Sequence, residues 1–133
     1  MTGQFKEVGN SGYIKHNGGL LFRQVRASEY QFRVVVREFH LNSSGTTHGG
    51  FIMTLLDTGM GTSAFRFLGG DKRIATISLD VNFIGPSFAG HVLTGAATII
   101  RKTRSLIFVR GELQRNENII ATADGVWKIL SQK

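Results

Sequence analysis

Hydrophobic positions recur with helical spacing in one stretch of the chain, directly after a polar loop at residues 42–47 and a His48-Gly49-Gly50 turn. We expect a helix from the glycine pair to about Phe67, where Gly69-Gly70-Asp71 supplies C-cap and turn residues. Apolar residues cover both faces of this helix: Ile52, Met53, Leu55, Leu56, Met60, Ala64 and Phe65. A helix that is hydrophobic most of the way round belongs in a core.

Alternating or β-branched stretches predict the strands. The expected strands are residues 20–26, 30–41, 77–83, 91–102, 105–115 and 119–130. The first of these also fits a helical turn. In the third, Leu79, Val81 and Phe83 alternate with polar residues, which indicates a half-buried strand. The Asn116-Glu117-Asn118 turn is short, so the last strands should pair as antiparallel hairpins.

One helix inserted after the first long strand and followed by a meander of strands is typical of an α+β layout. We expect a single domain at residues 20–133, in which a curved antiparallel sheet wraps around the long central helix. Residues 1–19 are rich in Gly, Asn and Ser and are expected to form a loose lead-in. The 133 residues are enough for one hydrophobic core.

Composition narrows the function classes. The chain has no cysteine, which excludes disulfides, thiolate catalysis and cysteine-bound zinc. No apolar run approaches the roughly 18 residues of a membrane span, and the start lacks a signal-peptide pattern, so we expect a cytoplasmic protein. The net charge of +7 favours anionic partners. Because no nucleic-acid-binding module is recognisable, we expect a phosphorylated small molecule rather than nucleic acid.

One ionisable group falls inside the expected core helix. Asp57 lies midway along it, where a charged side chain is unfavourable unless it is paired, hydrogen-bonded or functional. Asp57 follows Gly49 of the His48-Gly49-Gly50 turn by eight residues, and Asn42 precedes that glycine by seven. This spacing, with the strand ISLDVNFIGPSFAG and the closing GVWKIL, resembles the hotdog-fold acyl-CoA thioesterases. The resemblance covers residues 20–130 and is greatest to the phenylacetic-acid-pathway and thioesterase-superfamily-member-2-like subgroup.

The two halves of a catalytic site follow from the chemistry of these residues. Backbone N–H groups at a helix N-terminus can polarise a thioester carbonyl and hold the oxyanion formed by attack of water. Gly49 would supply this donor, with Gly50 as a further substrate-binding residue, and a plain helix start is the alternative. Asp57 would act as a general base or as a nucleophile, and a structural cap is its alternative.

Eight residues of helix rise about 12 Å, too far for Gly49 and Asp57 of one chain to act on the same carbonyl. Two copies with antiparallel helices would bring them together, so we expect a homodimer with two composite sites. The resemblance implies the same arrangement, and it implies a tetramer built as a dimer of dimers.

The resemblance also assigns supporting roles. Asn42 would position the thioester, and Ser78 would orient the attacking water, with Thr76 as the alternative if the alignment shifts. His48 would either brace the turn or take part in catalysis. Coenzyme A would bind at the basic cluster Arg101, Lys102, Thr103 and Arg104, for which a solvated hairpin end is the alternative. No metal and no cofactor other than the coenzyme A of the substrate is expected.

The sequence therefore predicts an acyl-CoA thioesterase that hydrolyses an acyl- or aryl-CoA to the free acid and coenzyme A. An acyl-carrier-protein thioester is the alternative substrate. A hotdog dehydratase and a non-catalytic acyl-CoA-binding protein are the alternative functions.

Overall fold

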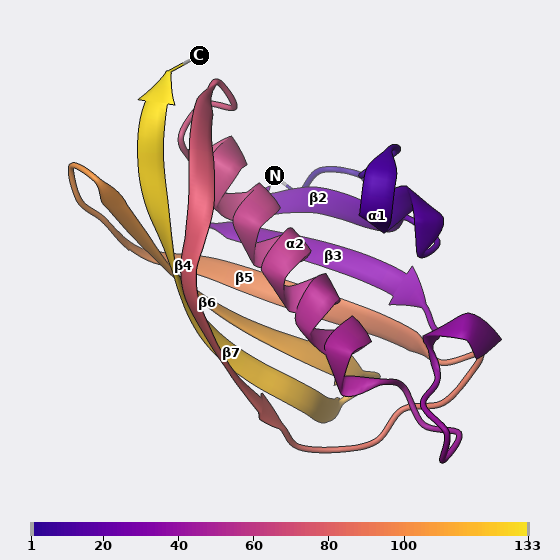
Figure 1. The fold of residues 1–133 in the computed structure, drawn as a ribbon. Coiled ribbons are helices and arrows are strands. Elements are labelled where there is room, and N and C mark those ends of the chain that lie inside the picture. The colour runs from indigo at the N-terminus through magenta and orange to yellow at the C-terminus, as the bar shows by residue number, and fades with distance from the viewer. Residues whose placement is uncertain (1, 133) are drawn as a thin grey trace.

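A computed structural model describes the backbone of residues 2–132 and the side chains of residues 2–130. Its strands are β1 (Lys6–Val8), β2 (Leu20–Arg26), β3 (Glu29–Val35), β4 (Lys72–Phe83), β5 (Val92–Lys102), β6 (Leu106–Arg115) and β7 (Asn118–Gln132). Its helices are α1 (Gly12–His16), the 3-10 turn η1 (Glu38–His40) and α2 (Gly49–Phe67). The seven strands form one sheet in the order β1-β2-β3-β5-β6-β7-β4, and all neighbours are antiparallel. This sheet curves around α2, which confirms the predicted α+β fold (Figure 1).

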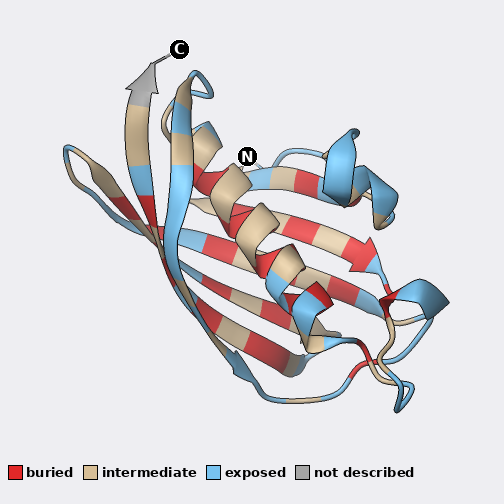
Figure 2. Ribbon diagram, viewed as in Figure 1, coloured by how far each residue is buried: buried red, intermediate tan, exposed pale blue. Residues whose placement is uncertain are grey.

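One stripe of α2 packs on the concave face of the sheet (Figure 2). Its buried residues are Phe51, Ile52, Leu55, Leu56, Gly59, Met60, Ser63 and Ala64. Two glycines let the layers approach closely, because a Cβ at Gly59 would lie 2.4 Å from the Phe32 ring and one at Gly111 would lie 2.6 Å from the sulfur of Met60. Burial of each large side chain in this layer stabilises the fold by about 1.5–3 kcal/mol.

The opposite stripe of α2 is not buried in the chain. Asp57, Gly61 and Phe65 follow one another at intervals of four residues and are all half-buried. The expectation that both apolar faces of this helix lie in a core therefore does not hold within the single chain. The sheet covers only one face of the helix, so Asp57 lies at the boundary of the core and reaches solvent.

The first long strand is shorter than the sequence predicts. β3 ends at Val35, and residues 38–40 form η1 instead of continuing the expected strand to residue 41. The N–H of Arg37 donates to His40 Nδ1, and the N–H of His40 donates to the carbonyl of Arg37. These local bonds close a tight turn and compete with the sheet ladder.

Residues 1–19 differ from the predicted loose lead-in over the part that the structure describes. β1 pairs with β2 at the sheet edge, and α1 follows it. The ring of Phe5 lies between the guanidinium groups of Arg23 and Arg33, at 4.2 and 4.3 Å from its centroid. Ile14 of α1 packs against the core. The lead-in is thus part of the domain.

β4 forms the other edge of the sheet and contains a β-bulge. Thr76 pairs with Trp127 and Ser78 pairs with Val126, so Ile77 is an extra residue with no partner in the register. Side chains of a strand alternate between the two faces of the sheet, and the bulge shifts this alternation between Thr76 and Ser78. As a result Thr76 faces α2, whereas the expected alternation would have turned it away from the helix.

Candidate active site

The His48-Gly49-Gly50 turn begins α2, and His48 is its N-cap. His48 Nδ1 accepts a 2.8 Å hydrogen bond from the N–H of Gly50, which supports the expected bracing role. This bond occupies the Gly50 amide, so the structure does not support Gly50 as a substrate-binding donor. The N–H of Gly49 has no acceptor among residues 2–132 and is the donor that remains available.

His40 is buried and holds the turn in place through the contacts of its backbone and its ring. The His40 carbonyl accepts the N–H of His48, and its imidazole stacks on Phe51 in the first turn of α2, with ring centroids 3.6 Å apart. Its Nδ1 accepts from Arg37, and its Nε2 lies 2.7 Å from the carbonyl of Asn17. The ring must be neutral to accept at one nitrogen and donate at the other. Burial lowers the pKa of His40, which favours this neutral form.

Asn42 belongs to the loop that precedes the turn. Its Oδ1 accepts hydrogen bonds from the N–H groups of Ser44 and Thr46, and its Nδ2 donates to Thr46 Oγ1 at 2.9 Å. These bonds are typical of an Asx turn. The structure therefore gives Asn42 a loop-forming role and does not bring its side chain into contact with Asp57.

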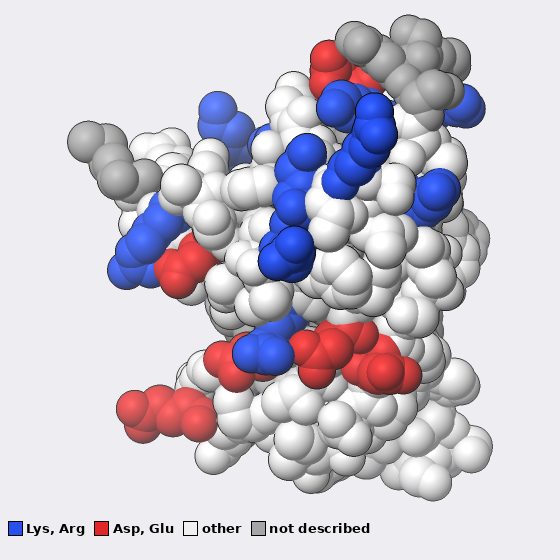
Figure 3. Space-filling view, turned by 90° about the vertical axis from the view of Figure 1, so that its left-hand side faces the viewer, with Lys and Arg blue, Asp and Glu red and all other residues white. Residues whose placement is uncertain are grey.

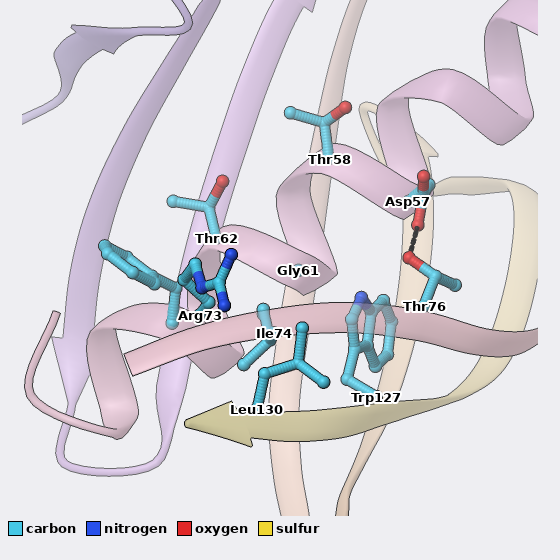
Figure 4. Close-up of a pocket in the computed structure, with 10 residues that line it drawn as sticks. Asp57, Thr58, Gly61, Thr62, Arg73, Ile74, Thr76, Trp127 and Leu130 are labelled. Atoms are coloured by element: carbon cyan, nitrogen blue, oxygen red, sulfur yellow. Dashed lines mark hydrogen bonds between the residues drawn. The ribbon is translucent and has the colours of Figure 1, made fainter. Parts of the chain in front are cut away.

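Asp57 is hydrogen-bonded to the edge strand. The hydroxyl of Thr76 donates to Asp57 Oδ1 at 2.8 Å, as Figure 4 shows. Ser78, the first choice from the sequence, instead lines a depression on the outer face of the sheet with Asp80 and Val126. The bulge at Ile77 causes this difference. Residues two apart in a regular strand share one face, whereas the extra residue places Thr76 on the helix-facing side and Ser78 on the outer side.

A groove of about 560 Å³ runs along the open stripe of α2, between the helix and strands β4 and β7 (Figure 4). Its polar lining includes Asp57, Thr76 and Arg73, and the indole of Trp127 forms part of its floor. The complete lining is Asp57, Thr58, Gly61, Thr62, Phe65, Arg73, Ile74, Thr76, Trp127 and Leu130. Sequence reasoning did not assign Arg73 or Trp127 to the site. Trp127 pairs with Thr76, which could have suggested it once the register was known, whereas Arg73 lies in a second register shift of β4, between Lys72 and Ile74.

The basic cluster lies at the β5–β6 hairpin, where Arg101, Lys102 and Arg104 are exposed. The hydroxyl of Thr103 both donates to the carbonyl and accepts from the N–H of Leu106, so it is engaged in the turn. On the face viewed in Figure 3, Lys and Arg gather above a band of Asp and Glu. Depressions on the outer side of the sheet are lined by Asp80, Glu112, Asp124 and Arg110. The excess positive charge is therefore not uniform over the surface.

The chain matches the thioesterase superfamily over residues 44–121, which is more than half of its length. It is 26% identical to a Pseudomonas aeruginosa protein with an esterase name, over 84% of both chains. The E. coli PaaI protein of the phenylacetic acid degradation operon has the same fold, with a TM-score of 0.83 at 18% identity over 93% of this chain and 88% of that one. A hypothetical thioesterase of Streptococcus pneumoniae, solved with coenzyme A, gives a TM-score of 0.77 at 19% identity over 86% and 88%.

The chain therefore belongs to the thioesterase superfamily, and it is a thioester hydrolase with the hotdog fold. The resemblance drawn from the His48-Gly49-Gly50 turn and Asp57 is confirmed at this level. Within residues 2–132, no helix is long and apolar enough to cross a membrane. The same residues contain no group of three or more His, Cys, Asp or Glu side chains that could hold a metal ion.

Proposed function

We propose that the protein hydrolyses an acyl-CoA thioester to the free acid and coenzyme A, in two composite sites of a homodimer. The observation that carries the proposal is the Asp57–Thr76 pair, which faces an open groove. The available N–H of Gly49 lies eight residues earlier on the same helix, about 12 Å away along its axis. A second copy of the chain would supply that donor.

The edge strand β4 supports such a dimer. It has 12 residues, and within the described part of the chain it pairs only with β7. An unpaired edge of this length is a template for pairing with another chain. The hydrophobic residues Ile77, Phe83 and Ile84 are more than half exposed on or beside this strand, at 56%, 55% and 58%. Pairing of two β4 strands would cover both the free backbone groups and these side chains.

The same pairing would give the orientation that catalysis requires. Thr76 lies toward the start of β4, and Phe83 ends the strand beside the α2 N-terminus, 3.4 Å from the position of a Cβ on Gly49. In an antiparallel pair of β4 strands, the end of one strand lies opposite the start of the other. Gly49 of one protomer would then approach Asp57 and Thr76 of its partner. Further pairing of such dimers would give the expected tetramer.

The proposed reaction begins with water held between Asp57 and Thr76. The Thr76 hydroxyl donates to Oδ1 of Asp57, which leaves Oδ2 to accept a proton from the water as its oxygen attacks the thioester carbon. The partner's Gly49 N–H and the positive end of its helix stabilise the oxyanion. Collapse of the tetrahedral intermediate expels the thiolate of coenzyme A, which takes up a proton to give the free thiol.

Asp57 could also attack the thioester carbon itself and release the thiolate from a mixed anhydride, which water then hydrolyses. After a single turnover in heavy-oxygen water, label in the Asp57 peptide would establish the anhydride route, because the general-base route never labels the enzyme. In the anhydride route the label enters the Asp57 peptide or the product, according to which carbonyl carbon water attacks. In the general-base route the label enters only the product.

Coenzyme A is proposed to bind through its phosphates at Arg101, Lys102 and Arg104. These three side chains are exposed at one hairpin, and guanidinium groups suit phosphate because they donate two parallel hydrogen bonds. Thr103 contributes the shape of the turn rather than a hydrogen bond to the ligand. Charge removal at the hairpin should raise KM for acyl-CoA while kcat changes little.

The test is release of free thiol from a panel of acyl- and aryl-CoA thioesters by the wild type and by Asp57→Asn. This substitution keeps the shape of the side chain and an acceptor for Thr76, but it removes the base. We expect turnover of some member by the wild type and a loss of about 10²–10⁴-fold in kcat in the variant. A folded wild type that turns over no member of the panel would contradict the proposal and favour a binding protein. An Asp57→Asn variant as active as the wild type would contradict the catalytic role of Asp57.

A further inference from the structure

Trp127 is the only tryptophan of the chain, and the residue is 2% exposed. It lies on β7 directly opposite Thr76 of β4, so the two side chains are neighbours on the helix-facing side of the sheet. Figure 4 shows its ring nitrogen pointing into the groove, beneath Gly61 of α2. The polar atom of a nearly buried side chain is thus aimed at the space beside the proposed catalytic pair.

The indole N–H of Trp127 donates to no acceptor in the described part of the chain, residues 2–132. No fully buried side-chain nitrogen or oxygen in this part lacks a partner, so the indole nitrogen must reach the groove surface. Asp57 and Thr76, which line the same groove, bond to each other and not to the indole. An interior indole N–H usually has a partner, so an acceptor from a bound molecule would complete this site.

Gly61 keeps the indole nitrogen accessible. A Cβ at this position would lie 3.2 Å from Trp127 Nε1 and would cover the N–H from the groove side. Glycine in the interior of a helix is unfavourable relative to alanine. Gly61 does not have a positive φ angle, so its backbone conformation does not require glycine. Access to the Trp127 N–H accounts for a glycine at this point of α2.

The rest of the floor indicates what the N–H would bind. Ile74, Leu130 and Phe65 line the same groove with apolar surface. An indole N–H in such surroundings favours a ligand that is largely apolar but carries one acceptor atom at this position. Gly61 follows Asp57 by one helical turn, which separates this acceptor from the thioester oxygen, for which the Gly49 N–H is the proposed donor. The apolar lining of the groove favours the acyl group as the source of the acceptor.

We propose that Trp127 is a specificity-determining residue, whose N–H donates a hydrogen bond to an oxygen on the acyl group and selects hydroxy- or oxo-acyl thioesters over unsubstituted ones. This inference rests on the proposed function, because it assigns the acyl preference of the same site. A site with a polar group that the wrong substrate leaves unpaired discriminates strongly against that substrate.

The test uses pairs of acyl-CoA thioesters of equal chain length, with and without a hydroxyl group at the second, third or fourth carbon. The wild type should prefer the hydroxylated member of at least one pair by about tenfold or more in kcat/KM. Trp127→Phe, which keeps an aromatic ring without a donor, should reduce this ratio toward one. Gly61→Ala should do the same while keeping the indole. Circular dichroism would establish that both variants are folded.

A second readout does not depend on turnover. Because the chain has one tryptophan, its fluorescence reports on this groove alone. In Asp57→Asn, titration with the same pairs should give tighter binding of the hydroxylated member. Equal affinity and equal kcat/KM within every pair would overturn the proposal, as would an equal loss on all substrates in Trp127→Phe. Absence of all hydrolysis combined with selective binding would instead contradict the proposed function and leave the selectivity of Trp127 supported.

Discussion

The hydroxyl of Thr76 on the edge strand β4 donates a 2.8 Å hydrogen bond to Oδ1 of Asp57 on α2. The bond joins the central helix to the strand at which a second chain would pair. Both side chains reach solvent, so the contribution of this bond to folding stability is small. Its consequence is orientation, because it fixes one carboxylate oxygen of a residue that lines the groove and leaves the other oxygen available.

Removal of the Thr76 hydroxyl should therefore affect catalysis more than stability. Thr76→Val keeps the shape of the side chain, and we expect kcat to fall about 10–100-fold, as for loss of a hydrogen bond to a charged group. Thr76→Ser should restore most of the activity, and KM should change little. Steady-state kinetics on the best substrate of the panel provides the measurement.

Ser78→Ala is the matched control for Thr76→Val. Ser78 lies two residues along the same strand but on the outer face of the sheet, so its substitution should change kcat less than about twofold. A large loss in Ser78→Ala with an unaffected Thr76→Val would contradict the position of the bulge and the assignment of Thr76.

His40 should make folding stability depend on pH. Burial lowers its pKa in the folded protein below the ordinary value of 6.5, so the unfolded chain binds more protons in that range. The contribution of neutral His40 is complete above pH 6.5 and is lost as the pH falls from there through the folded pKa. Urea unfolding should therefore give a free energy of unfolding that decreases as the pH is lowered from about 7.5 to about 5.5.

His40→Gln isolates this effect from the other three histidines. Glutamine can accept and donate at the two ends of its amide but does not titrate, so the variant should show a flatter pH dependence than the wild type. Parallel curves for the two proteins would show that His40 does not carry the linkage.

The edge of β4 should control assembly. Ile77→Lys places a charge on the exposed bulge residue, and lysine on an edge strand opposes pairing with another chain. We expect the dimer to dissociate to a monomer in sedimentation velocity, with thioester hydrolysis reduced about tenfold or more. Tyr13→Lys, at a 65% exposed position on α1, is the control and should keep both the dimer and its activity. A monomeric wild type with full activity would rule out the composite site.

The sequence predicted the elements that depend on local pattern. The glycine turn and the apolar spacing identified α2 from Gly49 to Phe67, and β5 differs from its predicted range by one residue. The strand expected to reach residue 41 ends at Val35, because the N–H of Arg37 donates to the His40 side chain and closes a turn that no periodicity predicts.

Positions that depend on pairing between strands were not accessible in this way. Asp57 bonds to Thr76 and not to Ser78, because the extra residue Ile77 places these two side chains on opposite faces of the sheet. Trp127 lies in the groove because it pairs with Thr76 and because Gly61 has no Cβ to cover it. The pattern of one strand contains neither relationship.

The composite site can be tested by mixing two inactive variants. Gly49→Pro removes the proposed oxyanion donor at the first helical position, where proline is well tolerated. His48 precedes it with φ −62° and ψ 134°, which a following proline permits. Asp57→Asn removes the base. Each variant alone should form an inactive dimer, because both of its sites lack one of the two groups.

Mixed dimers of Gly49→Pro and Asp57→Asn, formed by unfolding and refolding the two together, give the most direct measurement. One site of each mixed dimer would contain both substitutions and the other neither, so hydrolysis should recover to about one quarter of the wild-type rate. If Gly49 and Asp57 acted within one chain, every site would keep one defect. Activity no higher than the average of the two separate variants would therefore contradict the account.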